Sequence, residues 1–130
     1  MNVFAKAMNA AASGMNAQGF RMRVISENVA NTDTPGYQSK QISFENTYDR
    51  AADINKVEVG RMTLDLSPLQ RSYDPAHPLA DESGYVEMSN VNMVSEMADS
   101  REAGRSYEAN LATFNQARTM YSSLLDLLKR

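Results

Sequence analysis

The first residues to weigh as a chemical site surround the sole histidine, His77. Asp74, Asp81 and Glu82 lie within a few positions of it, and one imidazole with several carboxylates can bind a divalent metal. The chain has no second histidine to complete such a ligand set. The flanking prolines indicate instead an extended loop in which the imidazole makes a structural hydrogen bond or faces solvent. We therefore expect no metal and no other cofactor.

Acidic residues in the middle of the chain are the other candidates for catalysis. Two paired carboxylates could serve as the acid and base of a glycoside hydrolase. A hydrolase also needs a walled cleft, which a short segment without tryptophan would hardly build. The serines stand in no G-x-S-x-G motif, and no P-loop or GxGxxG motif is present. We therefore expect that the protein is not an enzyme. The alternative is that it is a small peptidoglycan hydrolase. Its candidate carboxylates would be Glu45, Asp65, Asp74, Asp81 and Glu87.

Composition limits the class of protein further. The 130 residues are 42% hydrophobic and 22% charged, with a net charge of −3, so the chain offers no basic surface for nucleic acid. It contains no cysteine, which excludes disulfides and thiolate metal sites. We expect no transmembrane segment, because no run approaches the roughly 20 apolar residues that span a bilayer. The N-terminal stretch lacks the apolar region of a secretory signal.

The prolines divide the chain into three segments. All four lie between positions 35 and 78, and both flanks have uninterrupted helical patterns. We expect an N-terminal coiled-coil helix over residues 1–30, an irregular or β middle over 31–92, and a C-terminal coiled-coil helix over 93–130. The fold class is mainly α with a small β or irregular middle, in an elongated subunit whose two long helices pair as a coiled coil.

The N-terminal helix has apolar residues at heptad positions a and d for four heptads, interrupted by Gln18 at one d position, and small residues at position e. These small and apolar residues together form an arc around the helix that is wider than the roughly 100° stripe that one partner helix covers. Small side chains let neighbouring backbones approach closely, and methionine fills irregular gaps. This surface is typical of assembly with further helices. The predicted seam comprises Met1, Phe4, Ala5, Met8, Ala11, Ala12, Met15, Gln18, Gly19, Met22, Ile25 and Val29.

The C-terminal helix carries a second heptad register that runs without a slip for more than five heptads. Ser89, Asn90 and Asn92 are candidate caps at its start. Polar or small residues interrupt the apolar register, which tends to set partner number at a cost in stability. We therefore expect an isolated subunit of marginal stability. The predicted seam comprises Met93, Met97, Gly104, Tyr107, Leu111, Phe114, Arg118, Tyr121, Leu125 and Leu128.

The middle segment begins with a turn over residues 31–37, where Pro35 disfavours helical geometry in Thr34. Alternating patterns at 37–44, 57–59 and 62–66 predict short strands. The stretch 73–85 is rich in proline and acidic residues and indicates an ordered loop without a regular period. The segment as a whole looks too polar to bury the N-terminal helix.

Several motifs resemble those of the flagellar basal-body rod proteins. The strings at 13–15, 26–31 and 34–37 are similar to the signature that rod and hook proteins share. The loop at 73–85 and the strings at 90–92 and 96–97 most resemble the proximal, C-type members. Ser89 departs from the proline that relatives often have there, and would start the helix with a serine cap. The turn motif comprises Asn28, Asn31, Thr34, Pro35, Gly36 and Tyr37, and the C-type loop comprises Tyr73, Asp74, Pro75, His77, Pro78, Gly84 and Tyr85.

The resemblance implies a structural subunit that is exported unfolded by the flagellar type III apparatus and polymerises into the proximal rod in the periplasm. It also implies that the paired terminal helices line the inner layer of a helical tube, which transmits torque and conducts later subunits. The middle would then pack outside, and the partners would be further copies and other rod proteins. A soluble coiled-coil adaptor is a further alternative, although it would not explain the motif strings.

Overall fold

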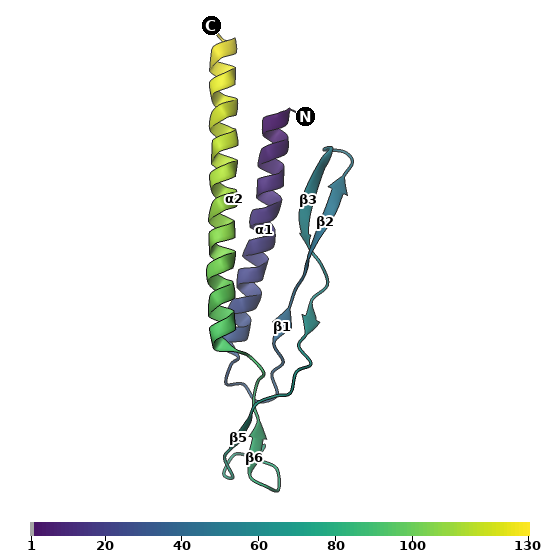
Figure 1. The fold of residues 1–130 in the computed structure, drawn as a ribbon, viewed down its shortest axis with the longest axis vertical. Coiled ribbons are helices and arrows are strands. Elements are labelled where there is room, and N and C mark those ends of the chain that lie inside the picture. The colour runs from purple at the N-terminus through teal and green to yellow at the C-terminus, as the bar shows by residue number, and fades with distance from the viewer. Residues whose placement is uncertain (1) are drawn as a thin grey trace.

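Two long helices dominate the computed structural model, which describes residues 2–130. Helices α1 (Val3–Ala30) and α2 (Met93–Leu128) lie side by side and run antiparallel (Figure 1). Their 28 and 36 residues correspond to lengths of about 42 and 54 Å. The predicted fold class, mainly α with a small β middle, is therefore confirmed. Met1, the first residue of the predicted seam, lies outside the described residues.

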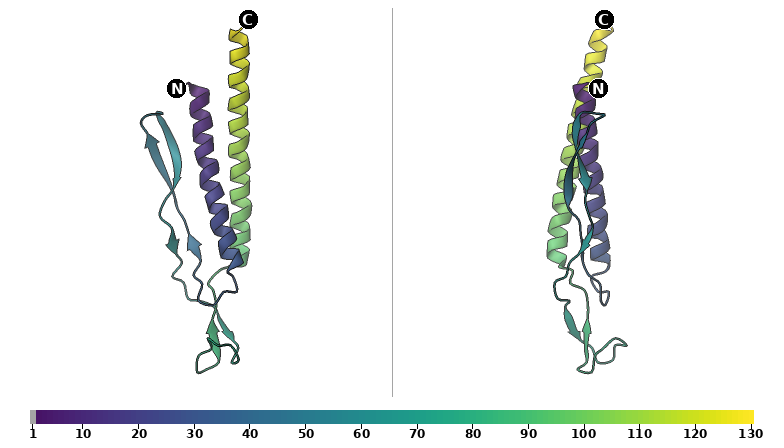
Figure 2. Two further views of the ribbon diagram at one scale, coloured as in Figure 1. Left: turned by 180° about the vertical axis from the view of Figure 1, so that it is seen from behind. Right: turned by 90° about the vertical axis from the view of Figure 1, so that its right-hand side faces the viewer.

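The subunit is elongated rather than globular, as two orientations of the ribbon show (Figure 2). Its accessible surface is 8931 Å². A compact protein of 14.4 kDa would expose about 6,800 Å². The difference shows that much of the chain's surface is left uncovered by its own fold.

Asparagine side chains begin both helices. The side chain of Asn2 accepts a hydrogen bond from the backbone N–H of Ala5 at 2.7 Å, and Asn92 accepts one from Ser95 at 3.2 Å. Each bond satisfies one of the free N–H groups of a first helical turn. The predicted serine cap is therefore wrong. Ser89 is buried, and its hydroxyl donates instead to the carbonyl of Thr32, which ties the turn after α1 to the chain before α2.

Helix α1 ends at Ala30, as predicted, and residues 31–37 form the expected turn. The backbone N–H of Thr34 donates to the carbonyl of Asn31, and that of Tyr37 donates to the carbonyl of Thr34. Gly36 has a φ of +76°. Its N–H donates to the carbonyl of Glu87 at 3.1 Å, so the turn is held against the segment that leads into α2.

Gly36→Ala should lower the free energy of unfolding by about 1 kcal/mol, because a Cβ is disfavoured at this positive φ. A Cβ placed there would meet no atom within 4 Å, so the loss comes from the backbone alone. Urea unfolding followed by circular dichroism measures it. Gly36→Asn is the matched control, since asparagine tolerates this conformation better. Equal losses in the two variants would contradict a backbone origin.

The middle segment forms three separate two-stranded antiparallel sheets, of which β1–β4 encloses the β2–β3 hairpin in the chain (Figure 1). Strand β1 (Lys40–Gln41) pairs with β4 (Thr63–Leu64), β2 (Phe44–Asp49) with β3 (Ile54–Val59), and β5 (Arg71–Tyr73) with β6 (Tyr85–Glu87). The predicted strand regions contain β1, β4 and part of β3. The sequence patterns missed most of the β2–β3 hairpin and all of β5 and β6. Strand β2 is exposed almost throughout, so no buried face gives it an alternating pattern.

The β2–β3 hairpin lies along α1 on the side away from α2 (Figure 1). The Lys6 ammonium pairs with the Asp53 carboxylate at 2.8 Å, and the N–H of Val57 donates to the Ser13 hydroxyl at 3.1 Å. Ile54 is buried at the start of β3. The expectation that the middle is too polar to cover α1 is thus corrected in part, because polar contacts hold the hairpin on one flank of the helix.

The core is small and is built largely of small residues. Ten apolar residues are buried in the described chain, of which five are alanine and the others valine or isoleucine. Nineteen large apolar side chains remain exposed. Since leucine, methionine and aromatic residues normally supply most of a core's stability, the subunit leaves its most strongly hydrophobic residues available to partners.

Candidate assembly surfaces

The two helices meet in a constant antiparallel register. Near the start of α1, the Phe4 ring lies 6.2 Å from the Tyr121 ring near the end of α2. At the centre, Gly14 lies so close to α2 that a Cβ there would be only 2.7 Å from the Asn110 amide nitrogen. A side chain at position 14 would therefore displace the Asn110 amide from its place between the two helices.

Charged residues extend this contact toward the turn. The Arg21 guanidinium on α1 lies 3.4 Å from the Asp99 carboxylate and 3.5 Å from the Glu102 carboxylate on α2. Gln18, a predicted seam residue, has a buried side-chain oxygen with no hydrogen-bond partner in the described structure. The middle of the helix pair is thus held by close packing and partly exposed charges rather than by a large apolar core.

On α2, the covered face lies beside the predicted a and d register. Ala103 and Ala117 are buried, and both stand at position g of that register. Because small residues allow two helices to approach closely, these alanines lie at the contact between α1 and α2. The predicted seam is consequently divided within the subunit. Its half-buried members are Gly104, Tyr107, Phe114 and Tyr121, and its exposed members are Met93, Met97, Leu111, Arg118, Leu125 and Leu128.

On α1, the predicted seam is also divided. Ala11 and Ile25 are buried, while the other described members are only half-buried. A Cβ on Gly19 would meet no atom within 4 Å, so this position faces open space. Ala12 instead lines a groove between α1 and β3 that Val57 also lines. We call Met8, Met15, Gly19 and Met22 the open strip of α1. The half-buried members are Phe4, Ala5, Met8, Ala12, Met15, Gln18, Gly19, Met22 and Val29.

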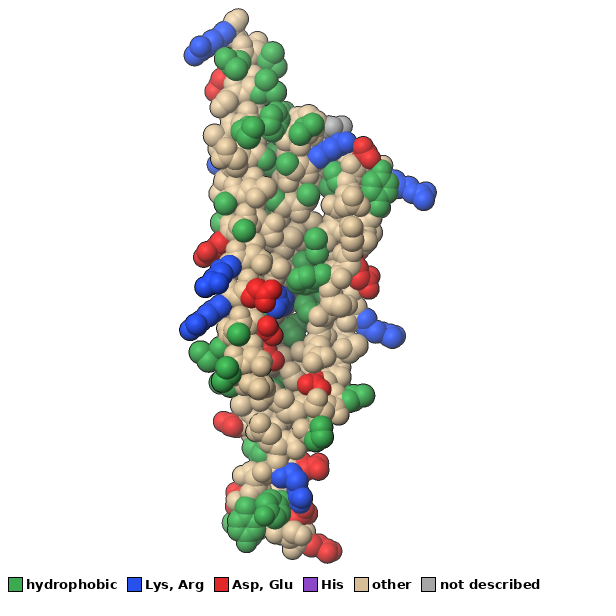
Figure 3. All heavy atoms as spheres, in the orientation of Figure 1, with side chains coloured by type: hydrophobic (Ala, Val, Ile, Leu, Met, Phe, Trp, Pro, Cys, Tyr) green, Lys and Arg blue, Asp and Glu red, His purple; other side chains and the backbone are tan. Residues whose placement is uncertain are grey.

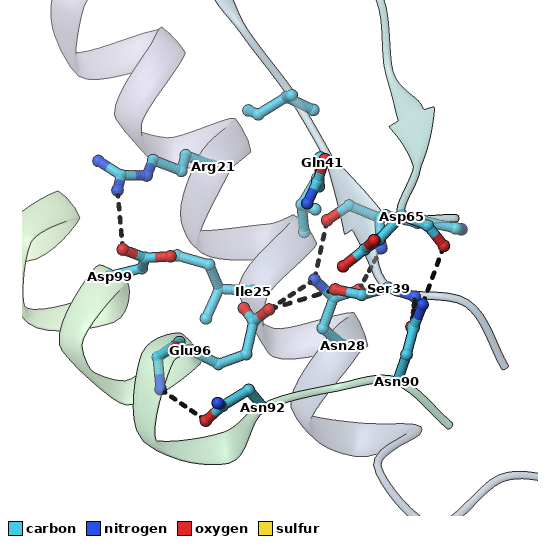
Figure 4. Close-up of a pocket in the computed structure, with 14 residues that line it drawn as sticks. Arg21, Ile25, Asn28, Ser39, Gln41, Asp65, Asn90, Asn92, Glu96 and Asp99 are labelled. Carbon is cyan, nitrogen blue, oxygen red and sulfur yellow. Dashed lines mark hydrogen bonds and ion pairs between the residues drawn. The ribbon is translucent and has the colours of Figure 1, made fainter. Parts of the chain in front are cut away.

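A buried asparagine joins the turn motif to both helices (Figure 4). Asn28 is 1% exposed. Its amide nitrogen donates to the Lys40 carbonyl at 2.9 Å and to the Glu96 carboxylate at 3.2 Å. Its side-chain oxygen accepts from the Tyr37 hydroxyl at 2.8 Å and from the Lys40 N–H at 2.9 Å. One side chain on α1 therefore fixes β1, the turn and the first turn of α2.

A second asparagine continues this network. The side-chain oxygen of Asn90 accepts from the Ser39 N–H at 2.7 Å, and its amide nitrogen donates to the Asp65 carbonyl at 2.9 Å. The Ser39 hydroxyl donates to the Glu96 carboxylate at 3.3 Å. We call Asn28, Tyr37, Ser39, Asn90 and Glu96 the junction cluster. All of its members except Tyr37 line a cavity of about 470 Å³ at the closed end of the helix pair.

The Glu96 carboxylate is the titratable member that faces this cavity. Burial raises its pKa above the ordinary value, and the nearby Asp99 carboxylate adds to the rise. Hydrogen bonds from Asn28 and Ser39, and the Arg21 charge, act in the opposite direction. Because the folded state binds the proton more tightly than the unfolded state, stability from this group is fully present at acidic pH. It declines as the pH rises through the raised pKa.

Glu96→Gln should raise the stability of the subunit at neutral pH, because the amide keeps an acceptor oxygen without a partly buried charge. The gain should vanish below about pH 4, where glutamate is itself protonated. Urea unfolding at both pH values measures the difference. Glu108→Gln, at an exposed position on the same helix, is the control and should change stability little at either pH. A loss of stability in Glu96→Gln at neutral pH would show that the charged carboxylate stabilises the junction cluster instead.

The C-type loop residues all lie in or beside the β5–β6 hairpin, at the end of the molecule opposite the C-terminus (Figure 1). His77 makes a structural hydrogen bond, as expected: its Nδ1 accepts from the Leu79 N–H at 3.0 Å. The Tyr73 and Tyr85 rings meet edge to face at 5.3 Å. Gly84 has a φ of +83°, and a Cβ there would collide with Tyr73 at 2.9 Å.

The candidate catalytic carboxylates are distributed over different hairpins. Glu45 lies on β2, Asp65 follows β4, and the other three lie around β5 and β6. Asp81 accepts hydrogen bonds from the backbone N–H groups of Tyr85 and Ser83, which hold its pKa below the ordinary value. A carboxylate with such partners caps a turn and is poorly suited to donate a proton as a general acid.

Within residues 2–130, no group of three or more metal-ligating side chains is placed to hold an ion. Neither long helix has an apolar stretch that could cross a bilayer. The sequence did not single out Ser39 and Glu96 as junction residues. The polar Glu96 among small and apolar residues near the start of α2 is the signal that could have identified it.

Two family comparisons match opposite ends of the chain. Residues 8–38 match the family described as flagella basal body rod protein. Residues 82–127 match the family described as the C-terminal part of flagellar basal body rod FlgEFG proteins. The first match covers most of α1 and the turn motif. The second begins just before β6 and covers nearly all of α2.

Curated relatives match almost the whole chain. The flagellar basal-body rod protein FlgC of Agrobacterium fabrum is 41% identical, with 99% of this chain and 98% of the relative aligned. FlgC of Borreliella burgdorferi is 37% identical over 94% and 95%. FlgC of Salmonella typhimurium is 33% identical over 98% and 96%. The chain therefore belongs to the FlgC family of flagellar basal-body rod proteins, and it is a structural subunit of the rod rather than an enzyme.

Proposed function

We propose that many copies of this subunit polymerise with other rod proteins into a helical tube in the periplasm. The terminal helices line its inner layer, through which later subunits travel, and the shared helix contacts transmit torque. The observation that carries this proposal is the surplus of exposed apolar side chains along α2, together with the half-buried methionines of α1. A polymer covers such surfaces, whereas a free monomer leaves them in water.

The assembly contacts follow from the faces that remain open within the subunit. The open strip of α1 and the exposed a-position residues of α2, such as Met97 and Leu111, present apolar surface that the subunit leaves partly uncovered. Between the helices, Ile25, Val29 and Met97 line a groove of about 440 Å³. Neighbouring helices would pack into this side of the pair. In this proposal the predicted seams are assembly surfaces, and only part of each seam is used for contacts within one copy.

The three segments have different tasks in this proposal. Residues 1–30 and 93–130 form the inner helical layer, and residues 31–92 form the outer one. The turn motif marks where the chain passes from one layer to the other, because α1 ends there and the junction cluster fixes the exit direction. In this proposal the chain reaches the rod through the flagellar type III export apparatus.

Hydrogen exchange on the free subunit and on the assembled rod tests the proposal. Amides of residues 1–30 and 93–130 should exchange slowly only in the rod, because assembly covers the helix faces that one copy leaves open. The hairpin at 71–87 provides an internal comparison for each sample. Equal protection of both helices in the free subunit and in the rod would contradict the proposed assembly role.

A further inference from the structure

The β2–β3 hairpin, residues 44–59, runs along α1 and is fixed at both of its ends (Figure 1). At the end that joins β1 and β4, the Gly60 N–H donates to the Ser43 carbonyl at 2.8 Å. At the loop end, the Lys6 ammonium on α1 pairs with the Asp53 carboxylate at 2.8 Å. The Tyr48 hydroxyl donates to the same carboxylate, which holds it in place. We call this hairpin the strap.

The strap is anchored to α1 by polar contacts and packs against it loosely. A groove of about 470 Å³ separates α1 from β3, and Val57, one of its lining residues, is still 39% exposed. Apolar side chains are visible in the space between the helix and the hairpin (Figure 3). Since little apolar surface is buried between them, the Lys6–Asp53 pair and the hydrogen bond from Val57 to Ser13 must supply much of the attachment.

The flank of α1 beneath the strap resembles a helix-packing surface. Ala12, Ala17 and Phe20 line the groove from the α1 side, and Ala17 is only 3% exposed. Small residues beside an aromatic ring would let another helix approach closely if the hairpin were absent. Helix α1 would then offer two faces to other copies, this flank and the open strip. A polymer with a single geometry needs such alternative contacts to be blocked.

We propose that the strap stays on α1 both before and after assembly and closes this flank of the helix to other copies. This inference rests on the proposed polymerisation, and it names the face of α1 from which neighbours are excluded. The loop conformation supports a dedicated attachment. Asp53 has a φ of +54°, which few residues other than glycine adopt and which aspartate tolerates better than most. Its carboxylate meets Lys6 from this conformation.

A disulfide lock tests the strap directly, because the natural chain has no cysteine. Ser13 and Val57 line the groove together, and the Val57 N–H donates to the Ser13 hydroxyl at 3.1 Å. Ser13→Cys/Val57→Cys should therefore form a bond within one chain, and the locked fraction should be the same in basal bodies as in the free subunit. Mass spectrometry after thiol alkylation measures both fractions. Ser13→Cys/Thr47→Cys is the matched control and should stay unlinked, since Thr47 lies on β2, the strand farther from α1 (Figure 1). Exclusion of locked chains from basal bodies would overturn the proposal.

Release of the strap gives an independent measurement on the free subunit. Lys6→Glu places a like charge against Asp53 and should open the flank, which lowers the concentration at which the free subunit self-associates by about tenfold. Sedimentation velocity measures that concentration. Lys129→Glu makes the same charge change far from the strap and should leave it unaltered. In the locked Ser13→Cys/Val57→Cys background, the effect of Lys6→Glu should disappear. Unchanged self-association in Lys6→Glu, or an increase that persists in the locked subunit, would overturn the proposal.

The outcomes also separate this inference from the proposed function. Cysteines placed on the open strip, as in Met15→Cys/Gly19→Cys, report contacts between copies. If these link chains in isolated basal bodies while locked chains are excluded from them, the polymer stands and the strap is wrong. If the open-strip cysteines link no chains, the proposed polymerisation is wrong, and the role of the strap falls with it.

Discussion

Asn28→Ala is expected to lower the free energy of unfolding by about 3 to 5 kcal/mol. The side chain is buried and makes four hydrogen bonds to three segments of the chain. Its removal leaves the Lys40 backbone groups and the Tyr37 hydroxyl without their partners, and each unsatisfied buried group costs about 1 to 3 kcal/mol. Urea unfolding followed by circular dichroism measures the loss. Asn16→Ala, at an exposed site on the same helix, should cost less than about 0.5 kcal/mol.

Asn28→Asp distinguishes the hydrogen-bonding role from simple packing. The variant keeps the shape and one acceptor oxygen, but it loses the donor to Lys40 and Glu96. It also places a second carboxylate beside Glu96, whose pKa is already raised by burial. The deficit should therefore be largest at neutral pH and should shrink as acid protonates the pair. A loss in Asn28→Ala no greater than in Asn16→Ala would refute the central role of this residue.

Gly19→Leu should abolish rod assembly and motility while the free subunit keeps its fold and its export. The reason is the open space around Gly19, where an added Cβ meets no atom of the subunit within 4 Å but the longer side chain enlarges the face proposed to contact neighbours. Gly14→Leu is the matched variant on the same helix. Its side chain would collide with Asn110 on α2, so the free subunit itself should lose stability by several kcal/mol.

Three measurements read out this pair of variants: thermal unfolding of the free subunit, the amount of each variant exported, and basal bodies seen by electron microscopy. Motile cells with normal rods carrying Gly19→Leu would rule out the open strip as an assembly contact. Unfolding of the free Gly19→Leu subunit would show that the position is not open. Ala12→Leu distinguishes loss of assembly from loss of folding less clearly than Gly19→Leu does. The reason is that Ala12 also lines the groove beside β3 within the subunit.

The helices could be predicted from the sequence because their signals are local. A run of turn-forming residues follows the end of α1, and Asn92 caps α2 one residue before its predicted start. Which face of α2 meets α1 could not be predicted in the same way. The heptad register predicts that large apolar residues such as Met97 and Leu111 form the contact face. The subunit instead buries Ala103 and Ala117, because small residues permit close approach.

The hairpins and the junction cluster depend on contacts between distant segments, which a sequence pattern does not contain. Strand β2 lacks a buried face, and its partner β3 is held on α1 by Lys6, Asp53 and Ser13. Asn28 and Tyr37 are both members of the turn motif. That Tyr37 donates to Asn28, and that Asn28 donates to Glu96, 68 residues further along than Asn28, could be learned only from the structure.

The division of the middle segment into three two-stranded sheets has a mechanical consequence. No strand is shared between sheets in residues 2–130, so force applied along the chain separates each pair of strands from one end, breaking hydrogen bonds one pair at a time. A wider sheet would resist by shearing many bonds together, whereas isolated two-stranded hairpins are marginally stable on their own. A motor that draws the polypeptide through a narrow conduit would therefore meet little resistance in this region, and the same strands bear tension only once neighbours clamp them.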